Sequence, residues 1–136
     1  MVFKINIAEK NGKTYHLEAE AQELLEKSLH DKIEGTDVSN ELGGYEFEIT
    51  GGSDKEGFPM RTDVEGVARR RIFLTNGVVG TKLNRKGVRL RKSIAGNTVS
   101  QLTSQINLKV IKAGNTSLDE IFGKTKKEEK AEESKE

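Results

Sequence analysis

The sequence predicts a mainly β fold of the α+β class: a small antiparallel, barrel-like sheet with one or two helices and a disordered charged C-terminal tail. Three observations lead to this prediction. Short segments along the chain alternate apolar and polar residues, which is the period of a half-buried strand. Two dipeptides, Asn11-Gly12 and Asn76-Gly77, are typical of tight β-turns. Apolar residues at helical spacing are confined to two short segments.

The N-terminal part is expected to form a β-hairpin followed by a helix. Val2–Ala8 and Thr14–Leu17 alternate on either side of the first Asn-Gly pair, so they should pair as antiparallel strands. Ala19–His30 has leucines at helical spacing with Glu, Gln and Lys between them, which indicates an amphipathic helix. Gly35 would end that helix.

Three further strands are expected in the rest of the chain. Their segments are Tyr45–Ile49, Val67–Thr75 and Gln105–Lys112, each with large apolar residues in alternation or in a short run. Gly51–Met60 has the composition of a loop throughout and holds the single proline of the chain. Gly80–Lys92 has too few apolar residues to form a core element alone.

The C-terminal region divides into two parts. Ser117-x-x-Glu120 has the pattern of a helix cap and predicts a short helix or linker over residues 115–123. Residues 124–136 are almost entirely Lys, Glu and small residues, so we expect a disordered tail. That tail is either a solubilising terminus, which we favour, or an acidic interaction arm. Residues 1–114 would form the one folded domain.

Composition excludes several classes of protein. The 136 residues fit one domain, and the absence of cysteine excludes disulfides, thiol nucleophiles and thiolate metal sites. No segment has the pattern of a signal peptide or the length of apolar sequence needed to span a bilayer. We therefore expect a soluble, cytosolic protein.

The net charge of +1 conceals a strong asymmetry along the chain. Residues 1–60 carry 6 basic and 13 acidic residues, whereas residues 61–112 carry 12 basic and 2 acidic residues. A single strongly positive block in a nearly neutral protein indicates a local site for a polyanion.

The basic block is densest between Arg69 and Lys92, where no acidic residue occurs. Phosphate is the expected counter-anion, because the arginine fork matches its geometry. The less favoured alternative is a solvated basic face balanced by the acidic half of the chain. The residues expected to bind RNA are Arg61, Arg69, Arg70, Arg71, Lys82, Arg85, Lys86, Arg89, Arg91 and Lys92.

RNA is a better candidate than DNA for this site. The chain lacks helix-turn-helix, zinc-finger and basic-zipper patterns. Phe73 is the one aromatic residue near the block, which argues against a base-stacking platform and favours recognition of RNA backbone and shape.

The loop Gly51–Met60 allows a catalytic interpretation and a structural one. Asp54 as a base, Lys55 and His16 could serve an enzyme acting on a phosphorylated small molecule, but the lysine-serine/threonine pair of a P-loop is missing. We favour a rigid turn that positions Arg61, with Phe58 and Met60 against the sheet.

The two histidines do not indicate a metal site. His16 lies on an expected strand face and His30 at an expected helix end, and neither has a carboxylate at metal-ligand spacing. We therefore expect no metal, no cofactor and no catalytic residue.

Two segments resemble a known family. ITGGSDKEGFPM, at Ile49–Met60, and RKGVRLRKSIAGNTVSQLTSQINLKVIKAG, at Arg85–Gly114, resemble signature blocks of the archaeal and eukaryotic e-type small-subunit ribosomal protein six family. The resemblance runs from about Val2 to Gly114 and fits an archaeal member best. The conserved framework of its first block falls on Gly51, Gly52, Asp54, Gly57, Pro59 and Met60.

The resemblance implies a structural, non-enzymatic component of the small ribosomal subunit, bound to ribosomal RNA and neighbouring proteins in the cytoplasm. The rival function is a nucleic-acid-binding regulator outside the ribosome. Two departures from the family matter. The chain has a short Lys/Glu tail in place of a long basic helix, so phosphorylation control should not be carried over. Ala95 lies where a basic residue is expected, so one phosphate contact would be missing.

Overall fold

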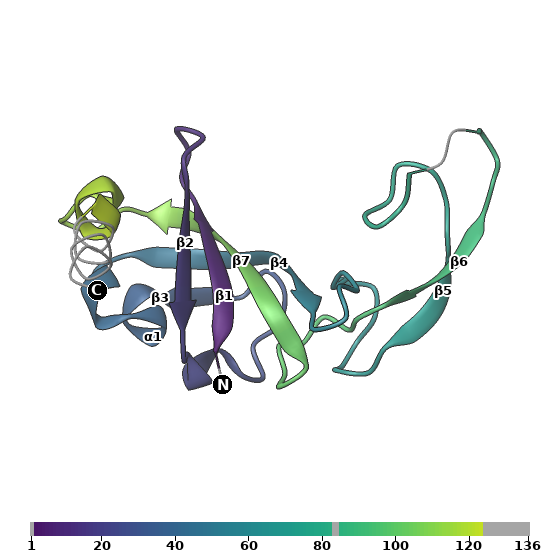
Figure 1. Cartoon of the computed structure of the whole chain (residues 1–136), viewed down its shortest axis with the longest axis horizontal. Coiled ribbons are helices and arrows are strands. Elements are labelled where there is room, and N and C mark those ends of the chain that lie inside the picture. Colours follow the sequence, from purple (N-terminus) through teal and green to yellow (C-terminus); the bar gives the residue numbers. More distant parts are fainter. Residues whose placement is uncertain (1, 83–84, 124–136) are drawn as a thin grey trace, which may run out of the picture.

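The computed structural model describes residues 2–82 and 85–123, and it is mainly β as predicted. Two separate sheets lie side by side along the long axis of the molecule (Figure 1). The larger has five strands in the order β2-β1-β7-β4-β3, and the smaller pairs β5 with β6. Neither sheet closes into a barrel. The strands are β1 (Phe3–Ala8), β2 (Thr14–Ala19), β3 (Lys32–Glu34), β4 (Glu46–Asp54), β5 (Arg70–Leu74), β6 (Leu90–Ile94) and β7 (Thr103–Lys112).

The N-terminal hairpin is confirmed. β1 and β2 pair antiparallel, with Phe3 opposite Ala19 and Ala8 opposite Thr14, and Gly12 takes a φ of 90° in the turn between them. The other edge of β1 pairs in parallel with β7, from Lys4 opposite Gln105 onward. This parallel pair departs from the all-antiparallel sheet expected from the sequence. It joins the first and last strands of the described chain.

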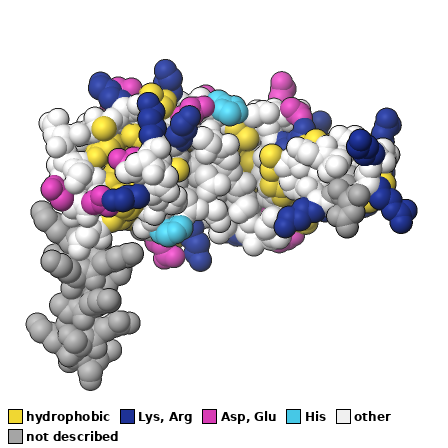
Figure 2. Space-filling model, turned by 90° about the horizontal axis from the view of Figure 1, so that it is seen from above, with side chains coloured by type: hydrophobic (Ala, Val, Ile, Leu, Met, Phe, Trp, Pro, Cys, Tyr) yellow, Lys and Arg dark blue, Asp and Glu magenta, His cyan; other side chains and the backbone are white. Residues whose placement is uncertain are grey.

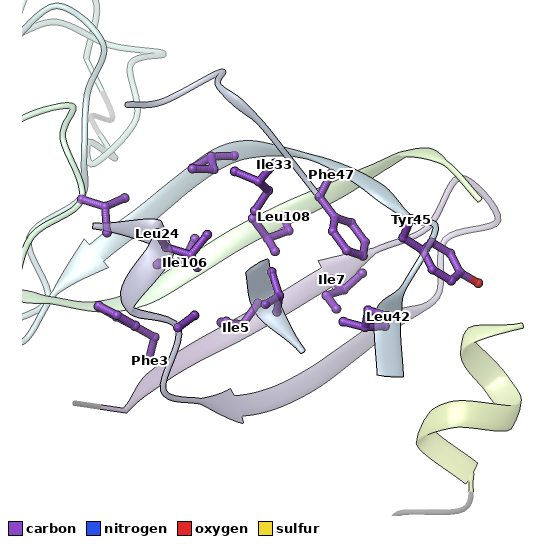
Figure 3. Packing of buried hydrophobic residues seen from close by; sticks show 14 of the residues in the cluster. Phe3, Ile5, Ile7, Leu24, Ile33, Leu42, Tyr45, Phe47, Ile106 and Leu108 are labelled. Atoms are coloured by element: carbon purple, nitrogen blue, oxygen red, sulfur yellow. The ribbon is translucent and has the colours of Figure 1, made fainter. Parts of the chain in front are cut away.

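The main core lies on one face of the five-stranded sheet. Alternate residues of β1 and β7 point into it, as Figure 3 shows for Ile5, Ile7, Ile106 and Leu108. The segment between β2 and β4 covers this face with three short helices. These are the 3-10 helices η1 (Gln22–Leu24) and η2 (Asn40–Leu42) and the α-helix α1 (Gly35–Val38).

The predicted amphipathic helix over Ala19–His30 is wrong. Only η1 is helical there, and Gly35 begins α1 instead of ending a helix. Leu24 and Leu29 are buried and Leu25 is half-buried, but the backbone pairs elsewhere: Glu26 N–H donates to Val99 O at 3.1 Å and Leu29 N–H to Asn97 O at 3.0 Å. Tertiary hydrogen bonds have replaced the intrahelical ones. His30, expected at a helix end, lies in a turn with a φ of 71°.

β4 is longer than predicted and includes the first four of the ten residues of the expected loop. It continues through Gly51, Gly52 and Asp54, paired with β7. The prediction that Gly51–Met60 is loop throughout is therefore wrong for its first four residues. The register shifts between Ile49 and Gly51, which indicates a β-bulge, a feature that glycine within a strand often marks.

β5 and β6 form a two-stranded sheet at the end of the molecule opposite the C-terminal helical segment (Figure 1). We call β5, β6 and the residues between them the basic arm. β5 was predicted but β6 was not, and Ile72–Leu74 was wrongly expected in the main sheet. The second Asn-Gly pair forms a turn, with Gly77 at a φ of 84°, but not a tight hairpin, because the long segment 75–89 separates the strands.

A small second core supports the basic arm. Val64, Leu74 and Ile94 are buried together, and Ile72 and Val78 pack against them. This cluster is separate from the main core, so the arm is held partly by its own apolar contacts.

Residues 118–123 are helical, in agreement with the predicted short helix. The tip of the N-terminal hairpin holds this segment: Tyr15 stacks on Phe122 with ring centroids 5.0 Å apart, and its hydroxyl donates to Asp119 Oδ1 at 2.7 Å. Lys13 Nζ lies 2.5 Å from Asp119 Oδ2. Desolvation and the Asp119 contact raise the pKa of Tyr15 to about 12. The predicted tail, 124–136, lies outside the described residues.

Among the described residues, no helix has the length and apolar character needed to cross a membrane.

Candidate nucleic-acid interface

A short segment after β6 attaches the basic arm to the main sheet. Its residues 95–99 run between two neighbours and hydrogen-bond to both. On one side Ala95 N–H donates to Pro59 O at 2.9 Å and Asn97 N–H donates to Val64 O at 2.8 Å. On the other side Val99 N–H donates to Lys27 O at 2.9 Å. We call residues 95–99, together with Lys27, Pro59 and Val64, the neck of the arm.

A buried ion pair reinforces the neck. Asp54, at the end of β4, is 6% exposed, and its Oδ2 lies 2.5 Å from Arg69 Nε, just before β5. Glu56 Oε2 contacts Arg69 Nη1 at 2.6 Å, and the guanidinium lies 5.2 Å from the Phe58 ring centroid. The Arg69 hydrogen bond lowers the pKa of Asp54 although burial opposes that shift. The carboxylate therefore stays charged and ties the main sheet to the arm.

Two of the ten cations predicted to bind RNA are therefore already paired with acids. Arg69 is neutralised by Asp54 and Glu56, and Arg61 donates from Nη2 to Asp63 Oδ2. The segment Arg69–Lys92 holds no acid of its own, as the sequence shows, but its first residue is paired with carboxylates from outside the segment. Sequence reasoning missed the pairing of Arg69 with these carboxylates because they precede it by more than ten residues.

The remaining eight predicted cations are exposed and have no acidic partner among residues 2–82 and 85–123. All of them belong to the basic arm, and Figure 2 shows Lys and Arg side chains gathered around the arm end of the molecule. The structure thus brings together the charges that the sequence spread over more than twenty residues. They are Arg70, Arg71, Lys82, Arg85, Lys86, Arg89, Arg91 and Lys92.

The register of the arm sorts its side chains onto two faces. Leu74 and Ile94 point into the small core, and by register Arg70 and Lys92 lie on the same face but remain exposed. Phe73 lies directly opposite Arg91, and Arg71 lies opposite Ser93, which places these four side chains on the other face. The Arg91 Cζ atom lies 5.8 Å from the Phe73 ring centroid.

The motif residues Gly51–Met60 make structural contacts within the folded protein. Gly57, at a φ of 87°, closes a turn in which Asp54 N–H donates to Phe58 O at 2.9 Å. Pro59 bridges to Ser53, and Met60, 6% exposed, bridges to Ala95. The structure thus has a turn here and places Met60 in the main core, as predicted. Asp54 is committed to Arg69, which leaves the catalytic interpretation without its base.

The histidines lie on the main sheet, away from the arm. His16 Nδ1 lies 2.5 Å from Asn6 Oδ1, and His30 Nδ1 lies 3.0 Å from Glu48 Oε1. No group of three or more His, Asp or Glu side chains suited to a metal ion occurs in the described part of the chain.

Ala95 does not lie on the surface of the protein. It is 8% exposed and packs in the main core beside Met60. The idea that a phosphate contact is missing at this position finds no support in the structure, because the alanine methyl group points into the protein.

Comparison with known proteins identifies the class to which this fold and basic arm belong. The sequence profile of the family Ribosomal protein S6e matches residues 3–123, which span both sheets, the neck and the helical segment. The chain therefore belongs to the ribosomal protein S6e family, as its two signature segments indicated.

Individual relatives agree over nearly their whole length. The small ribosomal subunit protein eS6 of Methanococcus maripaludis strain C6 is 45% identical over 115 residues, covering 84% of this chain and 90% of the relative. The protein of the same name from Archaeoglobus fulgidus is 43% identical over 126 residues, covering 90% and 96%. The chain is thus similar to archaeal members of a structural ribosomal protein family and is not an enzyme.

Proposed function

We propose that this protein is a structural component of the small ribosomal subunit that binds ribosomal RNA through its basic arm. One observation carries the proposal: eight exposed cations without an acidic partner in the described residues lie on one projecting two-stranded element. The subunit assignment follows the name of the relatives, small ribosomal subunit protein eS6. The same assignment implies that the protein is located in the cytoplasm and contacts neighbouring ribosomal proteins.

The arm suits a groove or junction crowded by phosphates. It projects from the main sheet, so RNA can approach its outer face and both edges (Figure 1). The acidic residues are concentrated in the main-sheet part of the chain, where they would repel phosphate. The neck, with its buried Asp54–Arg69 pair, holds the arm at a defined place on the body. Shape and backbone recognition are the usual means of holding structured RNA.

Binding to small-subunit ribosomal RNA should depend steeply on salt. With about five to eight phosphate contacts, the slope of log affinity against log salt concentration should lie between roughly −3.5 and −7. Filter binding or fluorescence anisotropy at increasing KCl would measure it. Affinity that barely changes between low and moderate salt would contradict the electrostatic account.

Neighbouring arginines in the chain should separate binding from folding. Arg71→Gln removes an exposed, unpaired cation, so it should reduce the magnitude of the salt slope by about one and leave the melting temperature unchanged. Arg69→Gln removes the partner of Asp54 and should lower the melting temperature instead. Equal losses of RNA affinity at unchanged stability in both variants would show that Arg69 also contacts RNA directly.

Co-sedimentation distinguishes this proposal from an extraribosomal regulator. A structural component should remain with purified small subunits at a salt concentration that releases loosely bound proteins. A protein that dissociates completely under those conditions while still binding other RNA would fit the regulator.

A further inference from the structure

We propose that the outer face of the basic arm holds an unpaired RNA base against the Phe73 ring, with Arg91 and Arg71 binding the adjacent phosphates. This inference rests on the proposed function and specifies what the arm recognises: a single-stranded nucleotide, in addition to duplex backbone. A purely electrostatic arm would bind a duplex at least as tightly as a single strand, because the duplex carries the higher charge density.

Phe73 lies in an unusual position for a large apolar residue. The residue is 70% exposed although it lies within β5 and large apolar side chains are normally covered. Its neighbours Ile72 and Leu74 are half-buried and buried on the opposite face, so the fold does not need Phe73 in its core. The ring is therefore available to a partner.

Two arginines lie beside the Phe73 ring. Arg91 lies directly across the strand pair, and its guanidinium carbon is 5.8 Å from the ring centroid, within cation–π range. Arg71 precedes Phe73 by two residues and points to the same face. An aromatic ring and a guanidinium plane both stack on bases, and arginine also binds phosphate bidentately. The scarcity of aromatic residues in the sequence is thus compensated by the cross-strand arginine.

The residues around Phe73 favour RNA over a protein as the binding partner. A protein partner for an exposed phenylalanine would have to accommodate two arginines beside it, in a segment from Arg70 to Lys92 that contains no acid. RNA supplies an apolar π-face and an anionic backbone within one nucleotide. In a continuous duplex the bases are stacked on each other, so the ring can reach only a base in a loop, a bulge or a strand end.

The experiment compares two RNA probes of equal length, a single-stranded oligoadenylate of about ten nucleotides and a duplex. Phe73→Leu in the full chain should weaken binding of the single strand about tenfold and leave duplex binding unchanged. The salt slopes should stay the same because no cation is removed. Val79→Ala is the matched control, since Val79 is another exposed apolar residue of the arm, 66% exposed. It should change neither affinity.

A second variant gives a direct signal of stacking. The chain contains no tryptophan, so Phe73→Trp places a single tryptophan at the site. Its fluorescence should be quenched by the oligoadenylate at saturation, and much less by the duplex.

The outcomes separate this inference from the proposed function. Wild-type protein that binds both probes with a steep salt slope, while Phe73→Leu loses nothing and Phe73→Trp is not quenched, would overturn base stacking and leave the proposed function standing. Wild-type protein that binds neither probe would overturn both. Unchanged RNA binding by Phe73→Leu combined with loss of incorporation into subunits would assign Phe73 to a protein contact and also overturn the inference.

Discussion

Gly52→Ala should destabilise the protein by about 3 kcal/mol, because β4 and β7 approach too closely at this point for any side chain. A Cβ atom on Gly52 would lie 2.5 Å from the backbone oxygen of Gln105 and 2.9 Å from Met60 Sδ. The methionine can move, but Gln105 is held between two strands, opposite Lys4 of β1 and Ser53 of β4. Relief of the clash therefore requires the two strands with the longest pairing in the fold to separate. Urea unfolding followed by circular dichroism would measure the loss.

The neighbouring Gly51 provides the matched control. A Cβ atom there would meet nothing nearer than Asn107 Nδ2 at 4.0 Å, and both glycines have backbone conformations open to L-residues. Gly51→Ala should change stability by less than about 1 kcal/mol and in the stabilising direction, because alanine reduces the entropy of the unfolded chain. Equal destabilisation by both substitutions would show that the bulge, and not the contact with Gln105, requires glycine.

Asp54→Ala should cost about 2 to 3 kcal/mol of unfolding free energy. The Asp54 side chain is 4% exposed and the Arg69 side chain 30% exposed, so the variant leaves a partly buried guanidinium with one of its two carboxylates gone. Water and Glu56 reach Arg69, which keeps the cost below that of a fully buried pair. Thermal and chemical denaturation would both show the loss.

Glu56→Ala tests whether burial is the cause. Glu56 binds the same guanidinium at 2.6 Å, but its side chain is 63% exposed. An exposed partner of this kind contributes at most about 1 kcal/mol, so the variant should remain close to wild type. Similar losses in the two variants would contradict the role given to the buried carboxylate.

The Asp54 contribution should also depend on pH in a defined direction. Arg69 lowers the pKa of Asp54 in the folded protein relative to the unfolded chain. The resulting stability is present at pH values above about 4, the ordinary carboxyl pKa, and is lost as pH falls through the lowered folded-state value. The difference in stability between wild type and Asp54→Asn should therefore shrink on acidification. A difference that stays constant down to the pH of acid unfolding would argue against a charged Asp54.

Part of this fold follows from local sequence alone. Alternation within Phe3–Ile7 and Ile106–Val110 predicts strands because a strand exposes every second side chain to the core, whatever its partner. The concentration of Lys and Arg after residue 60 likewise identifies the basic block without knowledge of the fold.

Other features depend on residues distant in the sequence. The leucines of the segment 19–30 have helical spacing, yet hydrogen bonds to Asn97 and Val99 hold the backbone in another conformation. β6 is too polar to be recognised alone, because only Ile94 of its residues is buried and its stability comes from pairing with β5. The sequence likewise shows Gly52 but not the Gln105 oxygen that excludes a side chain.

Some features of the candidate site likewise follow from the sequence alone, whereas others depend on the tertiary structure. The residue types by themselves determined that residues 61–112 carry a strong positive charge, since charge is a property of each side chain. Only the tertiary structure decided which cations are available, because Asp54 and Glu56 reach Arg69 from the end of another sheet. The apposition of Phe73 and Arg91 is also tertiary, since it arises from the register of β5 on β6. Periodicity and composition are local, whereas charge pairing and cross-strand stacking depend on which distant segments the folded chain brings together.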